Sequence, residues 1–115
     1  IRQARGILGQ GKLVGASTHT PDEWRQAVRG GADYAGVGPV FASRTKEFTD
    51  FAGLEYVRRI AMTNEIPWFA LGGIGQKNIE QVAEAGARRV AVSSCLAMSA
   101  DPRGEAMQMV SCLEP

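Results

Sequence analysis

Short apolar segments alternate four times with longer amphipathic segments along the 115 residues, and this alternation restricts the fold more than any other feature of the sequence. Strands alternating with helices of about ten residues predict right-handed βαβ crossovers and a parallel sheet. The expected strands are residues 13–17, 34–40, 66–71 and 89–93. The expected helices are residues 1–8, 21–29, 53–61, 78–85 and 102–112, with a loop or short helix starting at residue 94.

Capping residues fix where two of these helices begin. Thr20 stands directly before Pro21, and Glu23 follows three residues later, which is the pattern of a capping box. Asp101 and Pro102 repeat the N-cap and first-turn proline before the last helix. The two helices are therefore expected to begin at these prolines.

Composition limits the class of function. Thirteen basic residues against twelve acidic ones leave a net charge of +1, which gives no reason to expect binding to nucleic acid or to a membrane. No apolar run approaches the roughly 18 residues that span a bilayer, and we expect a cytoplasmic protein acting on small molecules. Cys95 and Cys112 lack metal-ligand spacing and are expected to be reduced packing residues.

Hydroxylic, glycine-rich or basic residues follow each of the four expected strands, at the end of a parallel sheet where ligands bind. The segment Ser43-Arg44-Thr45-Lys46 offers hydroxyl, guanidinium and ammonium donors suited to phosphate or pyrophosphate oxygens. Gly72-Gly73 lets a phosphate reach main-chain N–H groups, and Ser93-Ser94 adds further donors. His19, the single histidine, serves either as an acid or base or in the entry to the helix that follows it. Asp33 lies at the opposite, amino end of its strand, away from this chemistry.

Several motifs along nearly the whole chain resemble thiamine-phosphate synthase, a (β/α)8 TIM-barrel family. They are Ser-x-His-Thr from Ser17, Gly-Val-Gly-Pro-Val-Phe from Gly36, Ser-x-Thr-Lys from Ser43, Ala-Leu-Gly-Gly-Ile from Ala70, and Val-Ala-Val-Ser-Ser from Val90. A TIM barrel takes about 250 residues, so the resemblance implies an α/β half-barrel of four βα units. Residues 1–115 would be the carboxyl-terminal half, strands five to eight.

The resemblance also implies a reaction, in which a transferase moves hydroxymethylpyrimidine from its pyrophosphate to thiazole phosphate, giving thiamine phosphate and pyrophosphate. It implies pyrophosphate ligands at Ser17, Ser43, Thr45 and Lys46, with Lys46 catalytic, and thiazole phosphate ligands at Gly73, Ser93 and Ser94. Mg2+ would be the cofactor, held by residues outside this chain. Ala42 and Ser43 depart from the proline and threonine that the family often has. The isolated chain is expected to bind phosphate weakly and to catalyse nothing.

Other functions remain open from the sequence. The related thiazole tautomerase shares the segment around His19, although Ser-x-Thr-Lys favours the synthase. The glycine and serine segments alone would also suit another phosphate-binding barrel enzyme. A third alternative is a non-catalytic half-barrel that binds phosphate or self-associates through its exposed sheet edges. A separate four-stranded open sheet is an alternative fold and would leave two exposed parallel edges.

Overall fold

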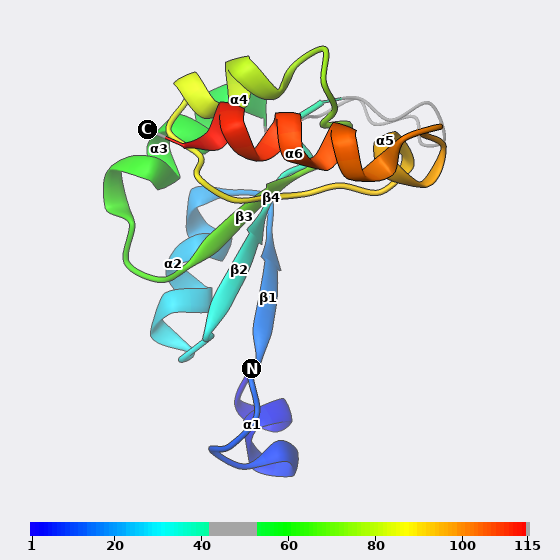
Figure 1. Ribbon diagram of the computed structural model, residues 1–115. Helices are drawn as coiled ribbons and strands as arrows, with labels where there is room; N and C mark the ends of the chain where they lie inside the picture. Colours follow the sequence, from blue (N-terminus) through cyan, green and yellow to red (C-terminus); the bar gives the residue numbers. More distant parts are fainter. Residues whose placement is uncertain (42–52, 115) are drawn as a thin grey trace.

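The structure, a computed structural model, describes residues 1–41 and 53–114 as alternating strands and helices (Figure 1). The elements in chain order are α1 (Arg2–Leu8), β1 (Gly15–Thr18), α2 (Pro21–Arg29), β2 (Tyr34–Val37), α3 (Gly53–Thr63), β3 (Trp68–Leu71), α4 (Ile79–Glu84), β4 (Val90–Ala91), α5 (Ser94–Ala97) and α6 (Pro102–Leu113). The predicted order of strands and helices is confirmed.

The four strands form one parallel sheet in the order β1-β2-β3-β4. Gly15 pairs with Tyr34 at the amino end of β1, and Thr18 pairs with Val37 at its carboxyl end. Because neighbours in the sheet are also neighbours in sequence, each crossover passes through one helical segment on the way to the next strand. The sheet therefore has two open edges within the described residues, β1 on one side and β4 on the other.

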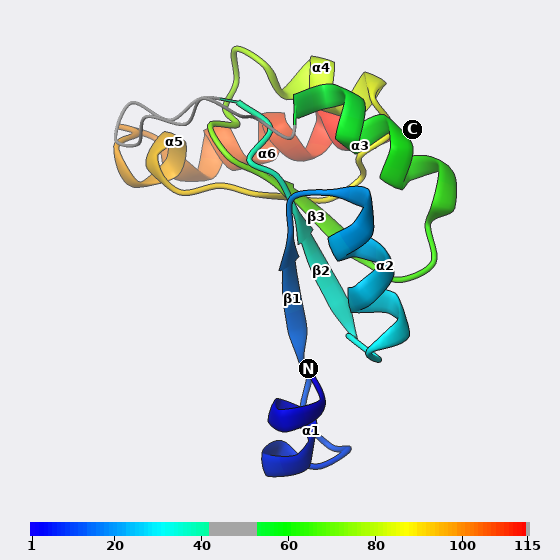
Figure 2. The same ribbon diagram turned by 180° about the vertical axis from the view of Figure 1, so that it is seen from behind.

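One face of the sheet carries the core and the helices. Alternate residues of the strands are buried there, including Ala35 and Val37 of β2 and Ala70 of β3, which are 0% exposed. Helix α2 contacts α3, α3 contacts α4, and α4 contacts α6, so these helices make a continuous layer (Figures 1 and 2). Apolar strand segments of this kind are typical of a parallel sheet with helices on both faces, whereas the described helices cover one face. The face that bears Tyr34 and Leu71 remains exposed.

The strands are shorter than the apolar segments that predicted them. Strand β1 begins at Gly15 rather than residue 13, and β2 ends at Val37, before Gly38-Pro39. Strand β4 has only two residues, because Ala70 and Leu71 are its only pairing partners on β3 in the described part of the chain. Hydrophobicity marks the apolar segment, whereas the strand extends only as far as a neighbour supplies partners.

Both predicted caps are present. The side chain of Thr20 accepts a hydrogen bond from the N–H of Glu23 at 3.2 Å, and Asp101 accepts one from Gly104 at 3.1 Å. Helices α2 and α6 begin at the two expected prolines, Pro21 and Pro102. These boundaries were predictable because all the groups that decide them lie within four residues of one another.

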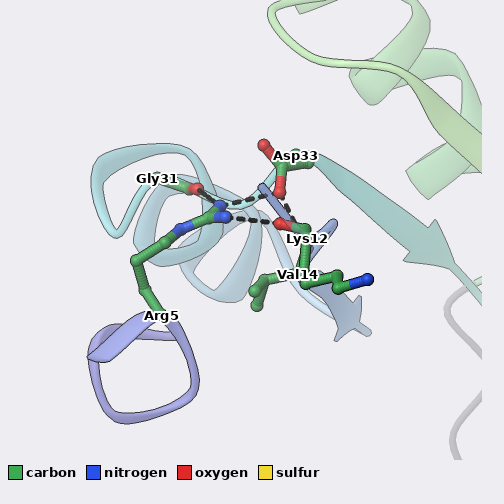
Figure 3. A network of polar contacts seen from close by, with 5 residues as sticks. All are labelled: Arg5, Lys12, Val14, Gly31 and Asp33. Atoms are coloured by element: carbon green, nitrogen blue, oxygen red, sulfur yellow. Dashed lines mark hydrogen bonds and ion pairs between the residues drawn. The ribbon is translucent and has the colours of Figure 1, made fainter. Parts of the chain in front are cut away.

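A network of polar contacts attaches α1 to the amino end of the sheet (Figure 3). Arg5 donates to the carboxylate of Asp33 at 2.7 Å and to the carbonyl oxygens of Lys12 and Gly31. The same carboxylate oxygen of Asp33 accepts the N–H of Val14 at 2.7 Å. The hydrogen bond from Arg5, and then that from Val14, hold the pKa of Asp33 below its ordinary value. Asp33 therefore lies at the amino end of the sheet, as predicted, and connects α1, β1 and β2.

Candidate active site at the carboxyl ends of the strands

The segments that follow the four strands lie in a row, since all four strands run in the same direction in sequence order (Figures 1 and 2). In parallel α/β folds this end of the sheet is where ligands bind, because the loops there converge around the ends of several strands. Contacts between successive segments show how closely the three neighbouring pairs of segments approach each other.

The first contact joins the segments after β1 and β2. Nδ1 of His19 lies 2.6 Å from the carbonyl oxygen of Gly38, and the N–H of Gly38 donates to the carbonyl of Thr18 at 3.3 Å. A carbonyl oxygen only accepts hydrogen bonds, so Nδ1 carries the proton. The N–H of His19 donates to the carboxylate of Glu23 at 3.0 Å, which gives His19 the predicted part in the entry to α2. An acid or base role for His19 stays a prediction.

The second contact joins the segments after β2 and β3. Val40 and Phe41 donate their N–H groups to the carbonyls of Leu71 and Gly72, both at 3.0 Å. A Cβ atom at Gly38 would lie 2.1 Å from the carbonyl oxygen of Leu71, so only glycine fits there. Gly72 has a φ of 108°, and a Cβ there would lie 2.6 Å from Cα of Pro39. Because these glycines have no side chains, the backbones that follow β2 and β3 can lie in direct contact.

The third contact joins the segments after β3 and β4. Asn78 accepts the N–H of Gly75 and donates to the carbonyl of Gly73, both at 2.9 Å, so one side chain fixes the shape of the glycine turn. A Cβ atom at Gly75 would lie 3.5 Å from Cβ of Cys95 in α5, which is ordinary van der Waals contact. Sequence reasoning missed Asn78 as a turn residue because it was read only as the start of a helix.

The predicted ligands that the structure describes are all exposed at this end of the sheet. Ser17 is in β1 opposite Gly36, Gly73 has a φ of 65° in the turn after β3, and Ser93 precedes α5, in which Ser94 is the first residue. The hydroxyl of Ser93 makes no capping hydrogen bond. Ser43, Thr45 and Lys46 lie outside the described residues. No distance tests the proposed ligand roles, and they stay predictions.

Tyr56 of α3 is hydrogen-bonded to the carboxyl end of β1. Its hydroxyl donates to Oγ1 of Thr18 at 2.6 Å, and that hydroxyl donates in turn to the carbonyl of Gly36 at 2.8 Å. Thr18 is 1% exposed and Tyr56 is 4% exposed. Burial raises the pKa of Tyr56, because the phenolate would lose its hydration. His19 is therefore held between Thr18, which is bonded to α3, and Thr20, which caps α2, and Ser17 adjoins Thr18.

The described residues provide no set of ligands for the expected Mg2+ ion. Within residues 1–41 and 53–114, no group of three or more histidine, cysteine, aspartate or glutamate side chains is placed to hold a metal ion. The described residues on their own therefore do not fit a Mg2+ site. No helix in the same residues is long and apolar enough to cross a membrane.

A parallel βα half-barrel with glycine and hydroxyl groups at the carboxyl ends of its strands defines the class of protein, an α/β fold of the TIM-barrel type. Residues 1–96 match the family model described as thiamine monophosphate synthase, and the chain belongs to that family. It is similar to thiamine-phosphate synthase of Synechococcus sp. strain WH7803, with 46% identity over 97% of the chain and 32% of the relative. It is 40% identical to the thiamine-phosphate synthase of Halalkalibacterium halodurans over 99% of the chain and 54% of that relative.

Solved structures agree with the fold. Thiamine phosphate pyrophosphorylase from Pyrococcus furiosus matches with a TM-score of 0.84 and 30% identity, over 97% of this chain and 53% of that one. The 3-hexulose-6-phosphate synthase of Salmonella typhimurium matches with a TM-score of 0.65 at 22% identity, which shows the fold alone. These matches confirm the predicted half-barrel. The chain spans between about a third and about half of the length of the relatives named here.

Proposed function

We propose that the whole protein is a thiamine-phosphate synthase, a transferase that joins hydroxymethylpyrimidine to thiazole phosphate and releases pyrophosphate. The observation that carries the proposal is the family match over residues 1–96, which includes the segments after all four strands. Two relatives that carry the name thiamine-phosphate synthase retain 40% and 46% identity across nearly all of this chain. Residues 1–115 would supply strands five to eight of the barrel.

The geometry supports a phosphate site after β3 and β4. Gly73 and Ser93 are exposed, and the N–H of Gly73 has no hydrogen-bond acceptor within the described residues. Asn78 holds the turn, and a Cβ atom at Gly75 would lie only 3.5 Å from Cβ of Cys95 in α5, so the two donor segments lie side by side. Fixed main-chain donors suit phosphate oxygens because they require no rearrangement on binding. We assign the thiazole phosphate to Gly73, Ser93 and Ser94.

The pyrophosphate would lie at the neighbouring segments, against Ser17, Ser43, Thr45 and Lys46. In the transfer, the bond from the pyrimidine methylene carbon to the pyrophosphate oxygen breaks, and the thiazole nitrogen forms a new bond to that carbon. Negative charge develops on the departing pyrophosphate, and hydrogen bonds from Lys46 and the hydroxyls would stabilise it. Mg2+ would add charge stabilisation, with ligands outside this chain.

The proposal includes small phosphate and pyrophosphate substrates and a cytoplasmic location. Cys95 and Cys112 are both free, which suits a compartment that keeps thiols reduced. Because the chain covers only part of its relatives, we expect it to bind pyrophosphate without turning over substrate.

Calorimetric titration with inorganic pyrophosphate and with thiazole phosphate tests the site. The Lys46→Ala variant is expected to weaken pyrophosphate binding by about 10- to 150-fold, since a charge-assisted hydrogen bond contributes about 1.5–3 kcal/mol. Thiazole phosphate binding should change little. Lys12→Ala is the matched control, because it removes the same charge at the amino end of the sheet, where the carbonyl of Lys12 accepts from Arg5.

Equal weakening by Lys12→Ala and Lys46→Ala would mean that only net charge matters, and it would overturn the assignment of Lys46. Assaying synthase and thiazole tautomerase activity in a full-length relative that carries the same substitution separates the two enzyme functions. Loss of tautomerase activity alone would contradict the synthase.

A further inference from the structure

The imidazole of His19 is fixed on one side and open on the other. Nδ1 lies 2.6 Å from the carbonyl oxygen of Gly38 and carries the proton, because a carbonyl oxygen only accepts hydrogen bonds. A neutral imidazole holds one proton, so Nε2 has a free lone pair. His19 is exposed, and within residues 1–41 and 53–114 its Nε2 makes no hydrogen bond. The ring can therefore take up a proton at Nε2 without losing its bond to Gly38.

Helices α2 and α3 hold the backbone around His19. Its N–H donates to the carboxylate of Glu23 in α2 at 3.0 Å. On one side of it, Thr18 accepts a hydrogen bond from Tyr56 of α3. On the other side, the hydroxyl of Tyr56 lies 3.2 Å from the carbonyl oxygen of Thr20. The ring is therefore positioned before a ligand arrives, which lowers the entropy lost on binding.

His19 is close in the chain to Ser17, which the proposed function assigns to pyrophosphate. The two residues flank Thr18, whose side chain is 1% exposed and bonded to α3, whereas Ser17 and His19 are both exposed. Side chains alternate along an extended chain, so Ser17 and His19 share the side that is turned away from α3. Their neighbours across the sheet are Gly36 and Gly38, which carry no side chain. Both polar side chains are therefore accessible to one anion at this end of the sheet.

Within the described residues, the ionisable groups bonded to His19 or to its flanking threonines are Glu23 and Tyr56. Carboxylates are ordinarily ionised above about pH 5. Tyr56 stays a neutral phenol, because burial raises its pKa. The segment after β2 contributes only the carbonyl of Gly38. Histidine side chains titrate between about pH 5 and pH 8, so a change of charge here over that range comes from the imidazole.

We propose that His19 is a further ligand of pyrophosphate, which Nε2 binds as an N–H donor once the ring has taken up one proton. The inference rests on the proposed function, which assigns pyrophosphate to Ser17. The proton comes from solvent and stays on the imidazolium, and Nδ1 keeps its bond to Gly38 in both states. Charge-assisted hydrogen bonds to anionic oxygens are about twice as strong as neutral ones. As negative charge grows on the departing pyrophosphate, the imidazolium stabilises it further.

Nitrogen NMR of the imidazole, with and without inorganic pyrophosphate, tests the proposal on the chain itself. The sequence has one histidine, so both ring nitrogens are assigned directly. In the free chain at about pH 8, Nδ1 is expected to carry the proton and Nε2 none. As the pH is lowered, Nε2 should become protonated at a higher pH with saturating pyrophosphate than without it, because pyrophosphate binds the protonated ring more tightly. Sulfate at equal ionic strength is the control.

Two substitutions separate a ligand from a residue that only holds the backbone. His19→Asn keeps an N–H donor near the position of Nδ1, within reach of the carbonyl of Gly38, and lacks Nε2. Relative to wild type at the same pH, it should raise the pyrophosphate dissociation constant about tenfold or more near pH 6 and change it little near pH 8.5. His19→Gln places a neutral donor near the position of Nε2 and should recover part of the affinity without the pH dependence. Comparison at each pH cancels the protonation of pyrophosphate itself.

Circular dichroism establishes that both variants are folded, and if one unfolds, the NMR titration of the unsubstituted chain decides. Pyrophosphate binding that falls in Lys46→Ala but leaves the protonation of Nε2 unchanged would overturn the role of His19 and leave the synthase proposal intact. Equal protonation by sulfate, or wild-type binding by His19→Asn at every pH, would also overturn it. Protonation of Nε2 with binding unaffected by Lys46→Ala would support His19 and contradict Lys46. No pyrophosphate binding at millimolar concentration would overturn both proposals.

Discussion

The hydroxyl of Tyr56 donates a 2.6 Å hydrogen bond to Oγ1 of Thr18, which joins α3 to the end of β1 although the two residues are 38 positions apart. The hydroxyl of Thr18 donates in turn to the carbonyl oxygen of Gly36 in β2. All three groups lie beside the residues that follow β1, so this chain of hydrogen bonds connects the helix layer to the candidate site.

Tyr56→Phe should lower the free energy of unfolding by about 1 kcal/mol, because it removes the hydroxyl that donates to Thr18 and also lies 3.2 Å from the carbonyl oxygen of Thr20, and leaves Thr18 with its bond to Gly36. For a domain of this size that corresponds to a fall of about 4–8 °C in the melting temperature, measured by circular dichroism. Tyr34→Phe is the control, because it removes the same atom from an exposed ring. Equal effects of the two changes would show that the Thr18 hydrogen bond contributes nothing.

The close approach of β2 and β3 at their carboxyl ends depends on Gly38. Gly38→Ala would place a Cβ atom 2.1 Å from the carbonyl oxygen of Leu71, and the backbone must shift to relieve the overlap. We expect a loss of about 1–3 kcal/mol in urea unfolding, as for other overpacked sites. Gly11→Ala is the control, since nothing lies within 4 Å of a Cβ atom there. A stability equal to that of the control would contradict the contact.

Local patterns predicted the parts of the fold that local groups decide. The cap at Thr20 and the start of α2 at Pro21 involve atoms a few residues apart, and both were correct. Apolar segments located the four strands but not their ends, since Gly15 becomes the first residue of β1 only because Tyr34 lies opposite it. An apolar run indicates that a strand is buried but not which part of the protein covers it, so the run did not predict which face of the sheet the helices leave bare.

The sequence predicted where the candidate site lies along the sheet, but not the contacts that hold its residues in place. Strand order alone implies that Ser17, Gly73 and Ser93 lie toward the carboxyl ends of the strands, and they do: Gly73 and Ser93 follow β3 and β4, whereas Ser17 lies within β1. The bond from Tyr56 to Thr18 joins residues far apart in sequence, and no spacing could reveal it. Asn78 had a local signal, because asparagine side chains commonly bond nearby backbone groups in turns, and that signal was overlooked.

Asn78→Ala should loosen the turn between Gly73 and Gly75, because it removes two side-chain hydrogen bonds of 2.9 Å. Amide exchange at Gly75 is expected to accelerate, and the dissociation constant for inorganic phosphate is expected to rise about fivefold for each bond of about 1 kcal/mol. Gln76→Ala is the control in the same turn, since its side chain bonds to Gln108 instead. Faster amide exchange with unchanged phosphate binding would show that this turn is not part of the phosphate site.

The bond between Arg5 and Asp33 should make the attachment of α1 sensitive to acid (Figure 3). The hydrogen bond from Arg5 lowers the pKa of Asp33 from an ordinary value of 3.8, so the folded state favours the carboxylate. Its contribution to stability is therefore complete above pH 3.8 and is lost as the pH falls through the lowered pKa of the folded state.

Asp33→Asn should release α1 already at neutral pH, because the amide lacks the charge that Arg5 pairs with. Proteolysis between α1 and β1, at residues 9–12, is expected to be faster in the variant than in the wild type. The two cleavage rates should become equal as the pH falls below 3.8 and the wild-type carboxylate is protonated. An acid-tolerant protease such as pepsin allows the comparison from pH 2 to pH 6. Asp22→Asn is the control, since Asp22 pairs with Arg25 within α2 and not with Arg5 of α1. Protease resistance that is identical in wild type and Asp33→Asn would mean that α1 is held by its other contacts, such as those of Arg5 with the carbonyls of Lys12 and Gly31.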